Sequence, residues 1–394
     1  MSRCVSLFLS KFAPQNKIMA GLYLHIPFCK QACHYCNFHF STSLKMKDEM
    51  VAAICRELSL QKDYLEGEPL ETIYFGGGTP SLLSQRDLDL IFGEIFKHYP
   101  ISAQPLEVTL EANPDDLTSL KIKELRQTPV NRLSIGVQSF SEEDLRFMNR
   151  AHNASEALGC IQNAQSAGFE NLSIDMIYGS PTTSHEQWAA NLETVFKLKI
   201  PHLSCYCLTV EPKTALAHKI KKGEAKPVED EHGARQFEFL MEKTAVAGYE
   251  HYEISNLALP GHYSRHNTSY WQGKKYLGVG ASAHSFNGVS RQWNVANNAQ
   301  YIRSMQAGEL SFEMETLTPV QRYNEYVMTG LRTKWGCSLL KIRDLGFAAE
   351  FAEGARQFLE DGTMERDGDI FRLTRTGRFL ADGIAAELFA EGEE

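Results

Sequence analysis

Residues 21–38 read GLYLHIPFCKQACHYCNF, and this stretch joins a β-strand to a cluster of three cysteines. Residues 21–27 have the composition of a strand, and Cys29, Cys33 and Cys36 follow it at once. Their Cys-x3-Cys-x2-Cys spacing allows one loop to wrap three thiolates around one corner of a cubane. A [4Fe–4S] cluster usually has four cysteine ligands, so three would leave one iron open to another ligand.

Two other interpretations of the cysteine cluster are weaker. Structural zinc takes four ligands, usually as two separated pairs, whereas this loop offers three. Chance clustering of three structural cysteines amid proline and aromatic residues is a still poorer explanation. We therefore predict that Cys29, Cys33 and Cys36 hold a [4Fe–4S] cluster.

The strand at residues 21–27 is the first of six β-rich runs. The others lie at residues 71–76, 107–112, 132–139, 171–178 and 202–209, and amphipathic stretches separate them. Such alternation predicts an α/β fold, with a parallel sheet and helical crossovers. Because six units are fewer than the eight of a closed TIM barrel, we expect an open, TIM-like partial (β/α)6 barrel with its chemistry at the carboxyl ends of the strands.

Three further segments complete the predicted domain organisation. Residues 19–248 form the partial barrel, and residues 249–316, rich in aromatics, His, Gly and Asn, extend it. In residues 317–394, helices precede short runs around residues 362–373 and a final helix over 377–389, which suggests an α+β module like a winged helix. This module has 14 Asp and Glu against 10 Lys and Arg, so it lacks the basic face of a DNA-binding domain.

Composition excludes several classes of protein. The chain has 394 residues and a net charge of −9, so nothing suggests electrostatic binding to nucleic acid. No apolar run approaches the ~20 residues of a transmembrane helix. The nine cysteines are scattered apart from one cluster, which favours a reduced, cytoplasmic compartment over a disulfide scaffold.

The first 18 residues have two interpretations. A signal peptide would explain the apolar patch at residues 5–9, but this patch is short and no small-residue cleavage site follows it. We therefore expect residues 1–18 to be a disordered leader or a misassigned start, with Met19 as the initiator.

A second motif, YFGGGTPS at residues 74–81, ends the second predicted strand. Three consecutive glycines remove every Cβ atom where the chain turns, so that the backbone can approach a ligand closely. No lysine follows, which excludes a Walker loop. One strand away from the cysteines, this turn is a candidate site for the amino group and methionine portion of a bound nucleoside ligand.

Together, YLHIPFCxxxCxxC and YFGGGTPS resemble the radical S-adenosylmethionine superfamily, in its subgroup of oxygen-independent coproporphyrinogen III dehydrogenases. The resemblance continues in order through LEANP (110–114), RLSIGVQSF (132–140), NRAH (149–152), IDMIYGSP (174–181), YEISN (252–256), HNTSYW (266–271) and YLGVGASAHS (276–285). It implies a (β/α)6 partial barrel with a C-terminal accessory domain. It also implies an electron donor that drives reductive cleavage of S-adenosylmethionine to methionine and a 5′-deoxyadenosyl radical.

The resemblance further implies which residues contact S-adenosylmethionine: Tyr23, Gly78, Thr79, Glu111, Gln138, Arg150 and Asp175. Glu111 can accept from the methionine ammonium or the ribose, and Arg150 can pair with the carboxylate. Gln138 and Asp175 suit the ribose hydroxyls. A carboxylate inside an apolar run is costly unless it is paired, which favours a binding role for Glu111 and Asp175. Arg150 has an alternative role as a surface charge at a helix end.

Two departures separate this chain from the dehydrogenases. The dehydrogenases have a fourth cysteine two residues after the third, and this chain has Phe38 at that position. The dehydrogenases also have a substantial segment before the first strand, whereas this chain has about 20 residues there. Both departures, with the HNTSYW block, resemble the sister HemW family of haem chaperones, which implies a protein that binds haem and transfers it to clients. The alternative functions are decarboxylation of coproporphyrinogen III propionates and radical chemistry on an unrelated substrate.

The HNxxYW motif of that family is linked to haem handling, which suggests His266 as an axial ligand of haem iron. Tyr270 and Trp271 would then offer aromatic faces to the macrocycle. Three alternatives stay open: a structural role for the whole motif, and ligation by His262 or His284 instead. No C-x-x-C-H sequence is present, so haem would be bound without a c-type linkage.

Overall fold

Six parallel strands form the centre of the molecule. The computed structural model describes residues 20–392, so the prediction for residues 1–18 lies outside it. The strands are β1 (Ala20–Ile26), β2 (Leu70–Gly77), β3 (Glu107–Ala112), β4 (Arg132–Gln138), β5 (Asn171–Tyr178) and β6 (His202–Cys207), and they lie side by side in chain order. The predicted α/β partial barrel is therefore confirmed, with each of the six strands within two residues of its expected bounds.

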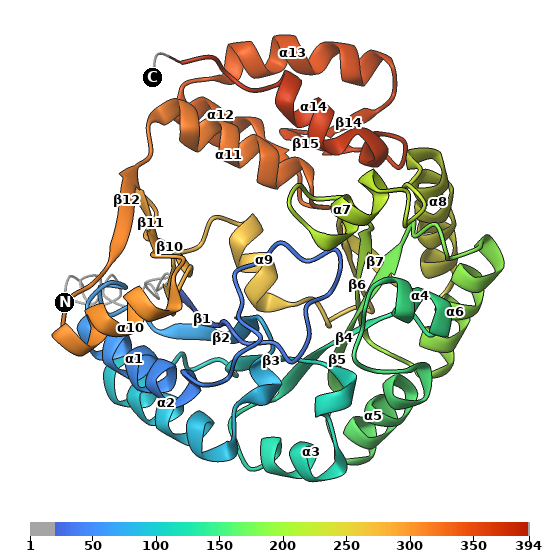
Figure 1. Ribbon diagram of the computed structural model, residues 1–394. Helices are drawn as coiled ribbons and strands as arrows, with labels where there is room; N and C mark the ends of the chain where they lie inside the picture. The colour runs from blue at the N-terminus through green and yellow to red at the C-terminus, as the bar shows by residue number, and fades with distance from the viewer. Residues whose placement is uncertain (1–19, 393–394) are drawn as a thin grey trace, which may run out of the picture.

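Helices connect these strands and cover the convex side of the sheet (Figure 1). They are α1 (Lys47–Leu60), α2 (Gln85–His98), α3 (Ser119–Leu125), α4 (Glu142–Phe147), α5 (Ala154–Ser166) and α6 (His185–Lys197), with the short 3-10 helices η1 (Pro80–Leu82) and η2 (Pro114–Asp116). Helix α2 illustrates why they form. Ser84 and Asp87 make a capping box, and the apolar stripe of Leu88, Ile91 and Phe92 is buried.

The two faces of each strand differ in chemistry. Side chains that face the helices are apolar and fully buried, such as Leu22, Phe75 and Leu133. The alternate positions carry polar or aromatic groups that contact one another across neighbouring strands. Tyr23 stacks near Tyr74, whose hydroxyl donates to Glu111. The concave side of the sheet is therefore a polar surface with the composition of a binding site, which differs from the branched apolar filling of a closed TIM barrel.

Residues 249–316 extend the sheet at both edges, although their sequence has little periodicity. Strands β7 (Glu250–Glu253) and β8 (Asn256–Ala258) add antiparallel to β6, after α7 (Ala215–Lys221) and α8 (Asp230–Val246). At the other edge β9 (Tyr276–Val279) pairs parallel with β1, followed by antiparallel β10 (His284–Phe286), β11 (Ser290–Asn294) and β12 (Phe312–Thr316). In chain order, helix α9 (Arg265–Trp271) lies between β8 and β9, and helix α10 (Asn298–Ala307) lies between β11 and β12. Strands this short carry too few residues for alternation to reveal them.

A buried carboxylate joins this second edge to the first helix. Glu57 of α1 is fully buried and accepts hydrogen bonds from the backbone of Gly280 (2.9 Å), the amide of Asn294 (2.7 Å) and the hydroxyl of Tyr301 (2.6 Å). Three donors satisfy a group that would otherwise be costly to bury. They fix the position of β9 to β11, which form one wall of the cavity described below.

The C-terminal part of the chain has an apolar core of its own and closes the opening between the two edges of the sheet (Figure 1). Its elements are α11 (Pro319–Leu331), β13 (Cys337–Ser338), α12 (Leu339–Leu345), α13 (Ala348–Glu360), β14 (Met364–Asp367), β15 (Ile370–Leu373), η3 (Gly377–Leu380) and α14 (Ala381–Glu387). Ion pairs hold it to both edges, from Arg332 to Glu253 at 3.0 Å and from Arg291 to Glu325 at 2.9 Å. Within residues 20–392, no helix has both the length and the apolar character to cross a membrane.

The final helix differs from its prediction over residues 377–389. Its first turn is the 3-10 helix η3, and the α-helix begins at Ala381. This turn begins at a close backbone contact that requires glycine, since a Cβ atom at Gly377 would lie 1.9 Å from the carbonyl oxygen of Thr363. The antiparallel β13, β14 and β15 next to these helices give this part the expected α+β character.

Candidate functional site

The cysteine loop leaves β1 at the carboxyl edge of the sheet and is closed by backbone hydrogen bonds. The amide of Cys29 donates to the carbonyl of Ser41 (3.0 Å), and the amide of Ser41 donates to the carbonyl of Pro27 (2.9 Å). Within the loop, the amide of Cys36 donates to the carbonyl of Cys33 (3.3 Å), which forms a turn between the second and third cysteines. All three thiols are free and half-buried, as ligands of a cofactor need to be.

The glycine-rich turn after β2 packs directly on the start of this loop. The amide of Gly78 donates to the carbonyl of Ile26 (2.9 Å), and that of Thr79 donates to the carbonyl of Phe28 (2.7 Å). A Cβ atom at Gly78 would lie 2.6 Å from the Phe28 oxygen, so only glycine allows this approach. The two sequence motifs therefore meet at one edge of the sheet.

Arg150 reaches this edge from the segment between α4 and α5. Its guanidinium donates to the Cys33 sulfur (3.0 Å), the Asn113 side-chain oxygen (2.7 Å) and the Gly136 carbonyl (2.8 Å), while its Nε has no partner. Glycine at position 136 leaves room for this guanidinium, because a Cβ atom there would lie 3.2 Å from it. The alternative of a surface charge at a helix end therefore does not describe Arg150, because the side chain is directed into the site.

Several residues that orient the site were not among its predicted members. Asn149, which has a positive φ of 57°, donates to the carbonyl of Ala32 (2.8 Å) and accepts from Gln31 through its backbone (2.9 Å). Lys30 pairs with Asp115 at 2.9 Å and also contacts Asp116. Asn149 lies in the NRAH motif and Asn113 in LEANP, so the motifs contained the signal, but only contacts across the sheet reveal the role.

Two carboxylates lie on the concave face beyond the cysteine loop. Glu111 accepts from the hydroxyl of Tyr74 (2.8 Å), and Asp175 accepts from the hydroxyl of Ser134 (3.3 Å). Burial raises the pKa of Glu111 to about 7 and that of Asp175 to about 6. Both carboxylates lack a basic side chain at ion-pair distance among residues 20–392, so a cationic ligand would find them uncompensated.

Orphaned polar atoms mark the same region. Gln138 has a positive φ of 62°, and its buried side-chain oxygen has no hydrogen-bond partner. Unpaired buried polar atoms are rare in folded proteins and call for an explanation such as a ligand or water. Of the predicted contacts, Gly78, Thr79, Gln138 and Arg150 lie near the loop, whereas Tyr23, Glu111 and Asp175 line the concave face next to it.

The residues fit a cluster better than a single metal ion. Within the described part of the chain, no three His, Cys, Asp or Glu side chains are gathered closely enough to hold one ion. Zinc ligands converge to about 2.3 Å from a single centre. Three thiols on one closed loop, with a guanidinium beside one of them, suit the larger and anionic cubane.

His266 lies at the opposite end of the strands. Its ring is fully buried, with Nδ1 2.7 Å from the Thr72 hydroxyl and Nε2 2.7 Å from the Tyr270 hydroxyl. Its backbone amide donates to Glu107 at the start of β3 (3.1 Å). Burial lowers the pKa of His266 to about 3, so the ring is neutral. Because both nitrogens are occupied, this conformation offers neither of them to haem iron, which favours the structural alternative.

A cavity of about 830 Å3 opens between the concave face, the antiparallel edge and α11. Tyr23 and His25 of β1 and Phe38 of the cysteine loop line one end, and Lys341 of α12 lies at the other. Phe38 is 69% exposed. The cavity is thus continuous from the neighbourhood of the cysteine loop to the C-terminal helices, and its volume suits a large organic ligand.

Comparison with known proteins agrees with this geometry. A model of the radical SAM superfamily matches residues 23–195, and a model of the HemN C-terminal domain matches residues 317–380. The haem chaperone HemW of Mycobacterium tuberculosis is 32% identical over 96% of this chain and 97% of its own. HemW of Bacillus subtilis is 32% identical over 95% of this chain and 100% of its own. The chain belongs to the HemW haem chaperone family.

A solved structure supports the fold. The coproporphyrinogen III oxidase HemN of Escherichia coli superposes with a TM-score of 0.83 over 95% of this chain and 91% of its own, at 23% identity. At this identity the likeness concerns the architecture alone. Within the HemW family, this chain therefore combines a radical SAM domain and a HemN-type C-terminal domain in the arrangement of Figure 1.

His266 provides a test of the structural role of the HNTSYW motif. Replacing His266→Ala leaves Thr72 and Tyr270 without partners in a buried site, and we expect it to lower the free energy of unfolding by about 2–4 kcal/mol. Urea denaturation measures this loss. The exposed His218→Ala variant is the control and should change stability by less than about 0.5 kcal/mol. A His266→Ala protein as stable as the native one would contradict the structural role.

Proposed function

We propose that this protein is a haem chaperone, which binds haem and transfers it to client proteins, and that it carries a [4Fe–4S] cluster and binds S-adenosylmethionine. The observation that carries the proposal is the near full-length similarity to HemW relatives. Phe38 supports it, since a phenylalanine stands where the dehydrogenases have a fourth cysteine. The cavity supports it as well, because its volume is large enough for a macrocycle.

Cys29, Cys33 and Cys36 would hold the cluster. When bound, the cluster and S-adenosylmethionine supply one-electron chemistry, and the protein supplies binding and orientation. Arg150 places a positive charge against Cys33, where it offsets the charge of the thiolates. Glu111 and Asp175 attract the cationic ligand, and the free oxygen of Gln138 can accept from its hydroxyl groups.

An electron donor is part of the proposal. Residues 213–226, which include α7, contain Lys213, Lys219, Lys221, Lys222 and Lys226 against a single acid, Glu224. The amide of Leu216 donates to the carbonyl of His34 within the cysteine loop (2.8 Å), so this cationic segment lies against the loop. A negatively charged donor would be drawn to this side of a chain whose net charge is −9.

We also propose a cytoplasmic location. The eight cysteines among residues 20–392 are all free, which suits a reducing compartment. Thiols that are to bind an iron–sulfur cluster must also stay reduced, which the same compartment favours.

The proposed function is tested by two assays on one anaerobically reconstituted preparation. The protein should bind haemin and pass it to an apo-haemoprotein, without converting coproporphyrinogen III to protoporphyrinogen IX at an enzymatic rate. Absorption spectra follow the first reaction, and porphyrin fluorescence after oxidation follows the second. Turnover of coproporphyrinogen without haem binding would favour the alternative, a dehydrogenase.

The cluster ligands are tested by single substitutions. Cys33→Ala should abolish the cluster absorbance and reduce bound iron by at least about tenfold, because it leaves only two of the three thiolate ligands. Cys160→Ala is the matched control, since Cys160 is buried in α5 away from the loop and should leave the iron content unchanged. Full iron content in the Cys33→Ala protein would overturn the assignment.

Binding of S-adenosylmethionine should depend on pH through Glu111. Its pKa of about 7 means that acidification neutralises the carboxylate and removes its attraction for a cation. The dissociation constant should be nearly constant above pH 8 and rise up to about threefold between pH 7.5 and 6.5. Calorimetry on reconstituted protein measures it. Glu111→Gln should bind weakly at pH 8 and lose most of the pH dependence, and an unchanged pH profile in this variant would exclude Glu111 as the titrating group.

A further inference from the structure

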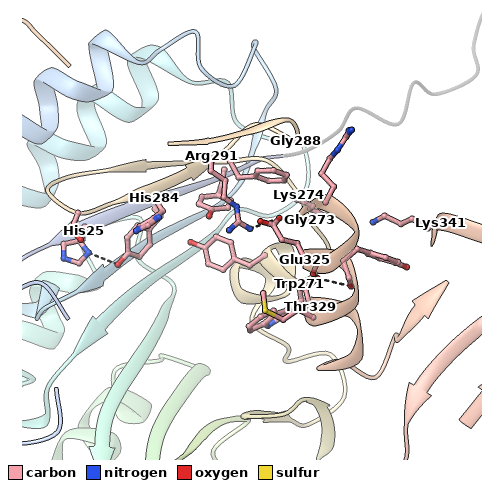
Figure 2. A pocket seen from close by; sticks show the side chains of 18 of the residues that line it. His25, Trp271, Gly273, Lys274, His284, Gly288, Arg291, Glu325, Thr329 and Lys341 are labelled. Carbon is pink, nitrogen blue, oxygen red and sulfur yellow. Dashed lines mark hydrogen bonds and ion pairs between the residues drawn. The ribbon is translucent and has the colours of Figure 1, made fainter. Parts of the chain in front are cut away.

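Histidine, cationic and aromatic side chains line the large cavity (Figure 2). Its walls come from several parts of the chain: the concave face of the sheet, the cysteine loop, helix α9, the antiparallel edge that follows it, and helices α11 and α12. The cavity therefore forms only when these parts of the chain are assembled. With a volume of about 830 Å3, the cavity lies in the upper part of the range of small-molecule sites.

Three histidines line this cavity, and they differ in the nitrogen atoms that they can offer. Both nitrogens of His25 are occupied, by the hydroxyl of Tyr23 (3.1 Å) and the carbonyl of His39 (3.0 Å). His39 has its Nε2 occupied by Asn298 (2.8 Å). His284 has no hydrogen-bond partner on either nitrogen among the described residues, and more than a third of its surface is exposed.

The setting of His284 suits a metal ligand. The residue opens strand β10, and its ring stacks near the ring of Trp293 on β11, with the centroids 6.2 Å apart and an interplanar angle of 28°. This contact limits the orientations of the ring. Burial and the positive charge of Arg291 lower the pKa of His284, so the imidazole is neutral and keeps a free lone pair. Figure 2 shows His284 directed into the cavity beside His25.

The cavity is also cationic, although the whole chain is acidic. Lys274, Arg291, Arg322 and Lys341 line it, against the single acid Glu325. Arg291 is paired with Glu325 at 2.9 Å, and Lys274 with Glu71 at 3.0 Å. Neither Arg322 nor Lys341 has an acidic partner within residues 20–392, and the Lys341 ammonium lies 4.1 Å from the centre of the Tyr326 ring. These two unpaired cations can receive carboxylates.

Aromatic side chains line the cavity together with the histidine and these cations. Tyr270, Trp271, Tyr276, Phe286 and Tyr326 all line the cavity. Tyr270 is held by His266, whose Nε2 lies 2.7 Å from its hydroxyl. The HNTSYW motif therefore supplies two aromatic wall residues, and its histidine is a positioning residue behind them.

We propose that haem lies in this cavity with His284 as an axial ligand of its iron and with its propionates at Arg322 and Lys341. This inference rests on the proposed haem-binding function. The iron ligand would then come from β10, and His266 would act indirectly by positioning Tyr270. One end of the same cavity is lined by Tyr23 and Phe38, so haem and the proposed radical SAM site would share a single space.

The test compares three probes on the full-length protein: haemin, iron-free protoporphyrin IX and haemin dimethyl ester. His284→Ala should shift the Soret band of bound haemin and weaken haemin binding at least about tenfold, while protoporphyrin IX binds as in the native protein. Arg322→Gln with Lys341→Gln should weaken both carboxylated probes several-fold and leave the dimethyl ester unchanged. His262→Ala, from the same segment but outside the cavity, is the control and should match the native protein.

The outcomes separate the site from the function. If the native protein binds haemin but His284→Ala keeps the native Soret band and affinity, the assignment of His284 is wrong while the proposed function stands. A Soret shift in His262→Ala alone would also contradict the assignment of His284, because it would place the iron ligand outside this cavity. If the native protein binds no haemin, the proposed function fails. Circular dichroism and urea denaturation of each variant establish that weaker binding does not come from unfolding.

Discussion

The structure depends on the alternation of side chains along six parallel strands. Apolar residues such as Leu22, Phe75 and Leu133 pack against the outer helices. Because side chains alternate along a strand, the neighbouring residues of each strand must face the concave side. A shift of register by one residue would exchange the two faces and bury the polar set against the helices. Burial of the apolar set therefore fixes the direction of Glu111 and Asp175, and the proposed binding surface is a consequence of core packing.

Position along the strands then divides this polar surface into two regions. Toward the amino ends, His266 bonds to both Thr72 and Glu107, although the buried guanidinium of Arg132 at the start of β4 has no hydrogen-bond partner. Toward the carboxyl ends lie groups with unused hydrogen-bonding capacity, including Gln138 and Arg150. A satisfied buried network stabilises a fold, whereas unsatisfied polar atoms next to glycines indicate a ligand. The same kinds of residue thus have structural roles at one end of the sheet and proposed binding roles at the other.

The cavity is a product of assembly between distant segments. The partial barrel leaves an opening between its edges, and the C-terminal helices close it through the Arg332–Glu253 and Arg291–Glu325 ion pairs. Closure places cationic groups of α11 and α12 opposite aromatic groups that follow α9. An open barrel with an accessory domain therefore provides both the polar surface near the cysteine loop and an enclosed space for a larger ligand.

The sequence by itself determined the six parallel strands, and it predicted a site at their carboxyl ends around the cysteine loop, because these follow from local periodicity and short motifs. It did not reveal β9 to β12, whose three to five residues are too short to show alternation. Nor could it distinguish His266 from His284. Whether an imidazole is available depends on what its two nitrogens contact, and the partners of His266 include Thr72, which lies 194 positions away in the chain. Only the tertiary structure decided that His266 is occupied and that His284 is free.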